Sequence, residues 1–146
     1  FMGTVCYFEK KRLQGEKMLQ VFLVGCGGFI GACCRYLLSL GFQRWDFQGF
    51  PVATLLANVI GAFFMGFITA LFSQCFPDKK GLQLFLTTGT LGGFTTFSTF
   101  SLETVNLYQS GHWGQGSIYL LMSIGGCLSG ILLGRLAASW LLSRIG

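Results

Sequence analysis

The sequence predicts an all-α membrane protein with four transmembrane helices per subunit. Its 146 residues are 52% hydrophobic and only 10% charged, and the mean hydropathy is +0.63, whereas soluble domains carry about 25% charged residues. Four apolar runs, each long enough to cross a bilayer, occupy most of the chain and leave no room for a separate soluble domain. The third run contains a motif that disfavours an unbroken helix.

The four predicted spans are residues 18–41, 51–76, 82–108 and 117–142. We expect residues 1–17 to be a polar N-terminal extension that need not be native, residues 18–142 to be the transmembrane domain, and residues 143–146 to be a short tail. The net charge of +5 is scattered over helix ends and loops. Its one cluster, Lys10–Lys11–Arg12, therefore predicts contact with lipid headgroups rather than with nucleic acid.

The first span combines small residues with one buried charge. Gly27 and Gly31 form a GxxxG pair, which permits close contact with a neighbouring helix. Arg35 lies late in the span, where it can reach the membrane surface or form a structural ion pair. The alternative is that Arg35 attracts anions at the mouth of a pore. After this span, Trp45 is expected to be an interfacial anchor.

The second span begins at Pro51 and carries a polar stripe formed by Thr54 and Asn58. An uncharged amide in hydrocarbon must find partners, and Asn58 offers two donors and an acceptor. The sequence leaves two interpretations open. Asn58 either joins two helices or faces a pore and donates to an anion.

The third span contains the motif GGFTTFSTFSLE at residues 92–103. Each of its adjacent glycines costs about 1 kcal/mol in a helix relative to alanine, and its Thr and Ser side chains compete for backbone hydrogen bonds. We therefore predict a helix break near the bilayer midplane, at Gly92 and Gly93. Broken helices supply the backbone groups with which transporters and channels bind ions.

Aromatic and acidic residues accompany this break. Phe94, Phe97 and Phe100 recur at intervals of three, which predicts one shared helix side. Such a stripe is usually packing, but aromatic ring edges are partly positive and can face an anion together with nearby hydroxyls. Glu103 follows the motif and is expected to be paired, protonated or in contact with water.

The fourth span carries two faces with a four-residue spacing. Tyr119, Ser123 and Cys127 form a candidate polar path, whereas the glycines of the other face predict a close helix interface: Gly126, Gly130 and Gly134. The single histidine, His112, is assigned to an interfacial loop. The six cysteines form no CxxC pair and have no histidine nearby, so we expect no zinc site. Nothing resembles a nucleophile–base pair or a metal set, so we do not expect an enzyme.

Three motifs resemble the Fluc/CrcB fluoride channels: GGFIGACCRY at 27–36, NVIGAFFMGF at 58–67 and GTLGGFTTFSTFSLE at 89–103. The resemblance covers about residues 18–142. It implies an antiparallel, dual-topology homodimer with two fluoride pores in the plasma (inner) membrane of a prokaryote. It also implies a passive, fluoride-selective channel that exports cytoplasmic fluoride and so lowers its toxicity.

The resemblance also assigns roles to residues. It implies a structural sodium ion at the dimer centre, bound by the backbone carbonyls of Gly92 and Thr95. Arg35 and Glu103 are implied as structural or pore-mouth charges. The implied fluoride pore comprises Asn58, Phe97, Phe100, Tyr119, Ser123, Cys127 and Thr54. Position 127 is Cys where the family usually has a hydroxyl residue, and a thiol is the weaker donor.

Two other membrane functions compete with the channel. A small four-helix multidrug exporter shares this size and dual insertion, but it needs a membrane-embedded acid in its first helix. The first span here contains Arg35 and no acid. A membrane subunit without transport activity is the second alternative. Simple packing does not need the hydroxyl-rich motif at 92–103, which favours the channel.

Overall fold

The computed structural model describes the backbone of residues 2–43 and 49–145 and the side chains of residues 14–43 and 49–144. Within these residues every regular element is helical. Trp45 and the side chains of Lys10–Lys11–Arg12 lie outside the described residues, so their predicted contacts with the membrane interface stay predictions.

Three helices are long and apolar enough to cross a membrane within the described part of the chain. They belong to α1 (Met2–Phe42), α2 (Val52–Cys75) and α6 (Trp113–Ile145). α2 agrees with the predicted second span to within one residue at each end. α1 begins well before residue 18, so the polar N-terminal residues continue the helix. α6 begins at Trp113 rather than 117, which leaves His112 in a very short turn.

The remaining helical segment is divided into four consecutive pieces, α3 (Lys80–Leu84), the π-helix η1 (Phe85–Leu91), α4 (Gly92–Phe94) and α5 (Phe97–Gln109). The π-helical part was not predicted. Within it the hydroxyl of Thr90 donates to the carbonyl of Phe85, five residues earlier, at 3.0 Å. π-Helical turns are rare and are often found near functional sites.

The helix break lies at Thr95 and Thr96, not at the glycines. Gly92 has helical dihedral angles of −63° and −36°, whereas Thr95 and Thr96 are both extended. The predicted interruption within the motif at 92–103 is thus confirmed, but it lies about three residues after the glycines to which it was assigned. β-Branched residues tolerate an extended backbone well, and threonine is a favoured N-cap of the helix that follows.

The glycines instead allow two pairs of helices to approach backbone to backbone. A Cβ atom on Gly93 would lie 3.0 Å from Cα of Gly28 in α1. A Cβ on Gly31 would overlap the carbonyl of Thr90, and one on Gly134 would overlap the carbonyl of Phe63 in α2. The close interfaces predicted from GxxxG in α1 and from the glycine face of α6 are thus confirmed.

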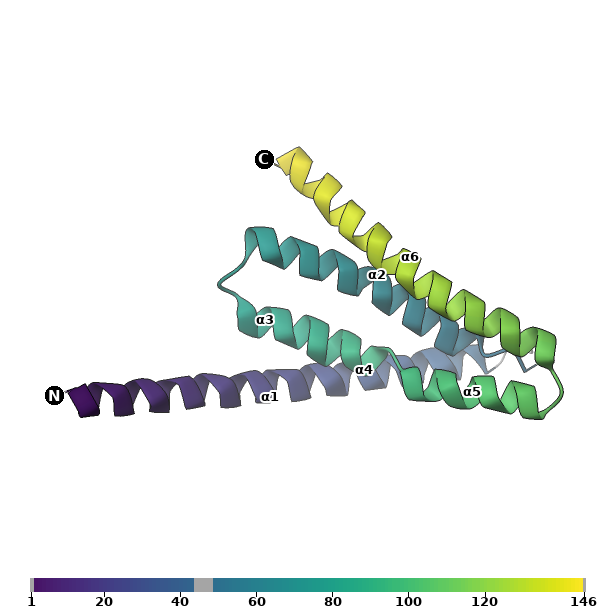
Figure 1. Ribbon diagram of the computed structural model, residues 1–146, viewed down its shortest axis with the longest axis horizontal. Coiled ribbons are helices and arrows are strands. Elements are labelled where there is room, and N and C mark those ends of the chain that lie inside the picture. The colour runs from purple at the N-terminus through teal and green to yellow at the C-terminus, as the bar shows by residue number, and fades with distance from the viewer. Residues whose placement is uncertain (1, 44–48, 146) are drawn as a thin grey trace.

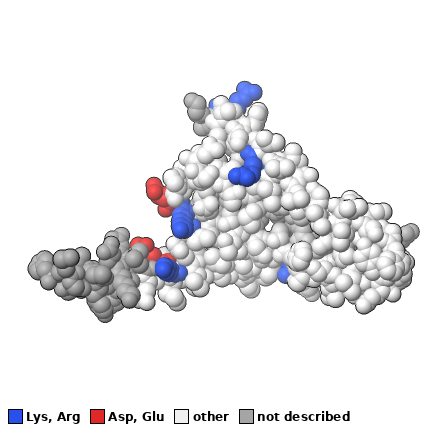
Figure 2. All heavy atoms as spheres, viewed as in Figure 1, with Lys and Arg blue, Asp and Glu red and all other residues white. Residues whose placement is uncertain are grey.

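The arrangement places the break inside the helical assembly. Figure 1 shows α3, η1 and α4 running between α1 and α2, and α5 continuing beyond the break beneath α6. The N-terminal end of α1 lies at the far left of this view and the C-terminal end of α6 at its top. A buried apolar cluster joins α2, α5 and α6 through Leu55, Phe100, Leu107 and Tyr119. On the face drawn in Figure 2 the described residues show few charged side chains, which gather mainly over the left and upper parts of the view.

Candidate functional site

The side chain of Asn58 binds the backbone at the helix break. Its Nδ2 donates to the carbonyl of Thr96 at 3.1 Å, and its Oδ1 accepts from the amide of Thr96 at 2.8 Å. An extended residue presents its N–H and C=O on the same side, so one amide side chain can satisfy both. Asn58 therefore joins α2 to the broken helix. This agrees with the first of the two interpretations that the sequence left open, in which Asn58 joins two helices.

These two hydrogen bonds leave the second N–H of the Asn58 side-chain amide unused. The backbone of Thr96 requires the oxygen of the Asn58 amide on one side and the nitrogen on the other, which fixes the orientation of the amide group. One Nδ2–H is used by the carbonyl of Thr96, and the second takes no part in the two bonds that fix this side chain. Asn58 also lines a cavity, so joining helices and facing a cavity are compatible.

This first cavity has a volume of about 380 Å³ and lies beside the break. Its polar lining comes from α2, the break and α6, through Asn58, Thr95, Thr96, Ser123 and Cys127. Ser123 is 4% exposed, and its Oγ has no hydrogen-bond partner. A buried hydroxyl normally finds a partner, so this donor is available to an acceptor in the cavity.

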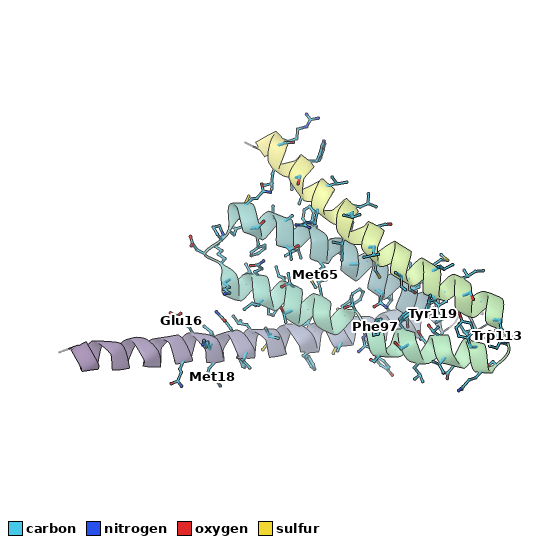
Figure 3. All side chains as sticks on the ribbon, in the orientation of Figure 1. Glu16, Met18, Met65, Phe97, Trp113 and Tyr119 are labelled. Carbon is cyan, nitrogen blue, oxygen red and sulfur yellow. The ribbon has the colours of Figure 1, made fainter. Side chains whose placement is uncertain are left out.

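Two phenylalanine rings complete one wall of the first cavity. Phe97 and Phe100 both line it, and their ring centroids are 5.6 Å apart with an interplanar angle of 52°. Figure 3 shows Phe97 at the start of α5, beside the break. Phe94 precedes the break in α4 and is not among the residues that line the cavity. The expectation that all three rings share one helix side was therefore wrong, because the extended residues separate Phe94 from the other two.

The rest of the first cavity is apolar. Met65 of α2 and three aliphatic residues contribute this part: Ile124, Leu128 and Ile131. Met65 lies on the side of α2 that faces the broken helix (Figure 3). None of the residues described as lining this cavity carries a charge. The sequence pattern gave no signal for these four, because apolar residues in a span are expected on every face.

Glu103 is held by two hydroxyl donors. Thr54 donates to its Oε1 at 2.9 Å and Tyr119 donates to its Oε2 at 2.7 Å. Tyr119 is fully buried, and Phe100 packs on its ring at 5.3 Å between centroids. Glu103 is therefore paired, as one of its three expected states, and its partners are two neutral hydroxyl groups. Thr54 and Tyr119 do not line the first cavity.

A second cavity of about 700 Å³ lies on the other side of this group. Glu103 and Thr54 line it together with His112 and Gln115, near the loop between α5 and α6. Phe100, Tyr119 and Glu103 therefore form a continuous set of contacts between the two cavities.

Among the residues that the structure describes, Arg35 binds the backbone of the broken helix and no acidic side chain. Its Nε donates to the carbonyl of Gly93 at 3.3 Å, from a partly buried position. In a continuous helix this carbonyl would accept from the amide of residue 97. Arg35 thus compensates one of the carbonyls that the break leaves free, which favours the structural interpretation over an anion-attracting role.

The break also deprives Gly92 and Thr95 of their helical partners. The amide of Thr96, which would bind the carbonyl of Gly92 in a continuous helix, donates to Asn58. The amide of Thr99, which would bind the carbonyl of Thr95, donates to the hydroxyl of Thr96 at 3.2 Å. Two hard oxygen atoms are thereby freed, whereas the described residues contain no His, Cys, Asp or Glu cluster suited to a metal.

Thr96 was not singled out as a site residue from the sequence. Its hydroxyl is the N-cap of α5, and its backbone is bound by Asn58. The signal existed, since threonine directly before a helix start is a recognised N-cap. This N-cap signal could not be assigned to Thr96 from the sequence, because the helix was expected to break earlier, at the glycines.

Comparison with known proteins agrees with these features. Residues 22–135 match the family described as CrcB-like protein, Camphor Resistance (CrcB). The fluoride-specific ion channel FluC of Ruminiclostridium cellulolyticum is 49% identical over 128 residues, which are 88% of this chain and 98% of that relative. The proteins of the same name from Clostridium novyi and Magnetococcus marinus are 42% and 43% identical over 120 and 122 residues. These cover 82% and 81% of this chain, and 94% and 99% of the relatives.

The family fits the predicted class of molecule. Its named members are ion channels and not enzymes, and the long apolar helices make this chain a multi-pass membrane protein of prokaryotic type. Because the family match extends over most of the chain and the relatives are well above 30% identical, the chain belongs to the CrcB-like family of ion channels.

Proposed function

We propose that this protein is a passive, fluoride-selective ion channel that exports cytoplasmic fluoride and lowers its toxicity. The observation that carries the proposal is the buried, unpartnered hydroxyl of Ser123 in an uncharged cavity next to the Asn58 amide. The cavity thus offers hydrogen-bond donors that no protein acceptor satisfies. The names of the relatives identify the anion as fluoride.

The chemistry of fluoride suits this lining. Fluoride is small and strongly hydrated, so a selective path must replace its water with closely spaced donors. Asn58 and Ser123 supply such donors, and the edges of Phe97 and Phe100 can approach an anion without a full positive charge. Conduction requires binding that is favourable but weak enough for release, which an uncharged site provides.

The segment from α3 to α5 is proposed as the fourth membrane span, and the functional unit as an antiparallel dual-topology homodimer in the lipid of the plasma membrane. The ring of Phe97 is 79% exposed although it lines the cavity. A second copy that covers this ring would close the open side of the cavity. Two copies would then form two such paths.

A structural sodium ion is proposed at the centre of this dimer. The carbonyl oxygens of Gly92 and Thr95, freed at the break, are the hard ligands that sodium prefers. Gly92 lies on the exposed side of the broken helix, where two copies can each contribute the same pair of carbonyls. The bound ion would supply a fixed positive charge between the two paths.

The alternative of a small multidrug exporter is not favoured by the relatives, which are named as ion channels. The one described acid beside the candidate site, Glu103, belongs to α5 and accepts hydrogen bonds from Thr54 and Tyr119. The first helix contributes Arg35 there instead.

The direct test is anion efflux from liposomes that contain the purified protein. Fluoride and chloride are loaded in parallel at the same concentration, and a potassium ionophore dissipates the membrane potential that efflux creates. We expect rapid fluoride release and chloride release no faster than from protein-free liposomes. Equal release of the two anions, or none of either, would contradict the proposed function.

A further inference from the structure

Thr96 connects both walls of the first cavity. Its backbone N–H and C=O are bound by the Asn58 side chain of α2, at 2.8 and 3.1 Å. Its hydroxyl accepts from the amide of Thr99 at 3.2 Å and donates to the Thr99 hydroxyl at 3.0 Å, within α5. Thr96 therefore helps to determine how the start of α5 is placed relative to α2, together with the hydrogen bond from Thr54 to Glu103 between the same two helices.

The two walls that Thr96 links contribute different groups to the first cavity: a hydrogen-bond donor from α2 and an aromatic ring from α5. On the α2 side, the pairing with Thr96 fixes the Asn58 amide and hence the direction of its second Nδ2–H. On the α5 side, Phe97 is the first residue of the capped helix, and its ring lines the cavity. The separation between this donor and the ring edge depends on the backbone at Thr96.

We propose that Thr96 is a positioning residue of the anion path, which holds the free donor of Asn58 and the ring of Phe97 at the separation that selects the anion. The inference rests on the proposed function. Loss of an N-cap changes the stability of the helix start by about tenfold as an equilibrium constant. Without the hydroxyl, the first turn of α5 can move and Phe97 moves with it.

The decisive variant is Thr96→Val. Valine keeps the shape, the preference for an extended backbone and the N–H and C=O that Asn58 binds, so only the cap is lost. We expect fluoride efflux about tenfold slower than wild type together with a lower ratio of fluoride to chloride efflux. Thr96→Ser, which restores the hydroxyl, should return both quantities to within about twofold of wild type.

Ser101→Ala is the matched control, because Ser101 lies in the same helix and its hydroxyl donates only to the carbonyl of Phe97 at 2.9 Å. Its efflux and selectivity should equal those of wild type. A Thr96→Val protein that is less stable yet conducts with unchanged rate and selectivity would show a merely structural role and overturn the proposal. Equal losses in Thr96→Val and Thr96→Ser would also overturn it.

If Thr96→Val does not yield folded protein, Thr96→Asn provides the test, because asparagine is an equally good N-cap. A folded Thr96→Asn protein should conduct fluoride selectively, and one that has lost selectivity overturns the proposal. Wild-type protein is measured in the same liposomes. Absence of fluoride efflux from wild type would refute the proposed function, whereas a wild-type response in Thr96→Val refutes only the role of Thr96.

Discussion

At the scale of single residues, Asn58 combines two tasks that sequence patterns treat as alternatives. It satisfies the N–H and C=O of Thr96 at the break, and it lines the cavity with a donor to spare. Hydrogen bonds that polarise one another strengthen each other in a medium of low dielectric constant. The bond that Asn58 accepts at Oδ1 from the amide of Thr96 should therefore make its remaining N–H a better donor to an anion.

Asn58→Asp is expected to reduce fluoride efflux to the level of empty liposomes. A carboxylate would repel the anion and would place an oxygen against the carbonyl of Thr96, which it cannot serve as a donor. The measurement is fluoride release with a fluoride electrode. Gln74→Glu makes the same amide-to-acid change at an exposed position of α2 and should leave efflux unchanged. Efflux at the wild-type rate in folded Asn58→Asp would remove Asn58 from the path.

Phe97→Ile should slow fluoride efflux by about fivefold. Isoleucine keeps much of the apolar bulk but has no electropositive ring edge, and an aromatic edge contact is worth about 1 kcal/mol. Initial rates of fluoride release from liposomes measure the effect. Phe64 of α2 is 45% exposed and does not line the cavity, so Phe64→Ile serves as the control. If both variants conduct equally well, the phenylalanines are packing residues.

At the scale of elements, the glycines and the threonines of the third span have separate tasks. Gly93 permits contact with Gly28 of α1, while Thr95 and Thr96 supply the extended backbone of the break. A break deep in a membrane needs partners for its freed backbone groups. Asn58 and Arg35 provide these partners from two other helices, so the break depends on its neighbours.

Gly134→Ala should destabilise the protein by about 1–3 kcal/mol, the range for an overpacked interface. The new Cβ would overlap the carbonyl of Phe63 and lie 2.8 Å from the amide of Phe67, so α2 and α6 would have to separate. Thermal unfolding in detergent measures the loss. Gly125→Ala on the same helix meets nothing within 4 Å and should be neutral or slightly stabilising. Equal melting temperatures for the two variants would contradict the close interface.

At the scale of the whole molecule, one chain leaves the candidate path incomplete. The ring of Phe97 is 79% exposed, and the freed carbonyls of Gly92 and Thr95 lie in a segment that a second copy can cover. The proposed dimer with a central cation would account for both observations. Its stability and the integrity of its paths would then depend on the same ion.

Sodium should raise the melting temperature of the purified dimer relative to buffer in which a large organic cation replaces it at equal ionic strength. A ligand that binds only the folded assembly stabilises it by mass action, whereas the organic cation is too large for a carbonyl site. Melting is followed by the loss of the dimer peak in size-exclusion chromatography after heating. An identical melting temperature in the two buffers would argue against the sodium ion.

The membrane class, the bounds of α2 and the close glycine interfaces follow from the amino-acid sequence, because apolar length and residue spacing are local properties of the chain. The sequence also identified Asn58, Phe97, Phe100, Ser123 and Cys127, which line one cavity. The exact position of the break in the third span, and the groups that stabilise it, depend on the packed helices. Asn58 and Thr96 are 38 residues apart and Thr54 and Glu103 are 49 apart, so their hydrogen bonds exist only after the helices pack.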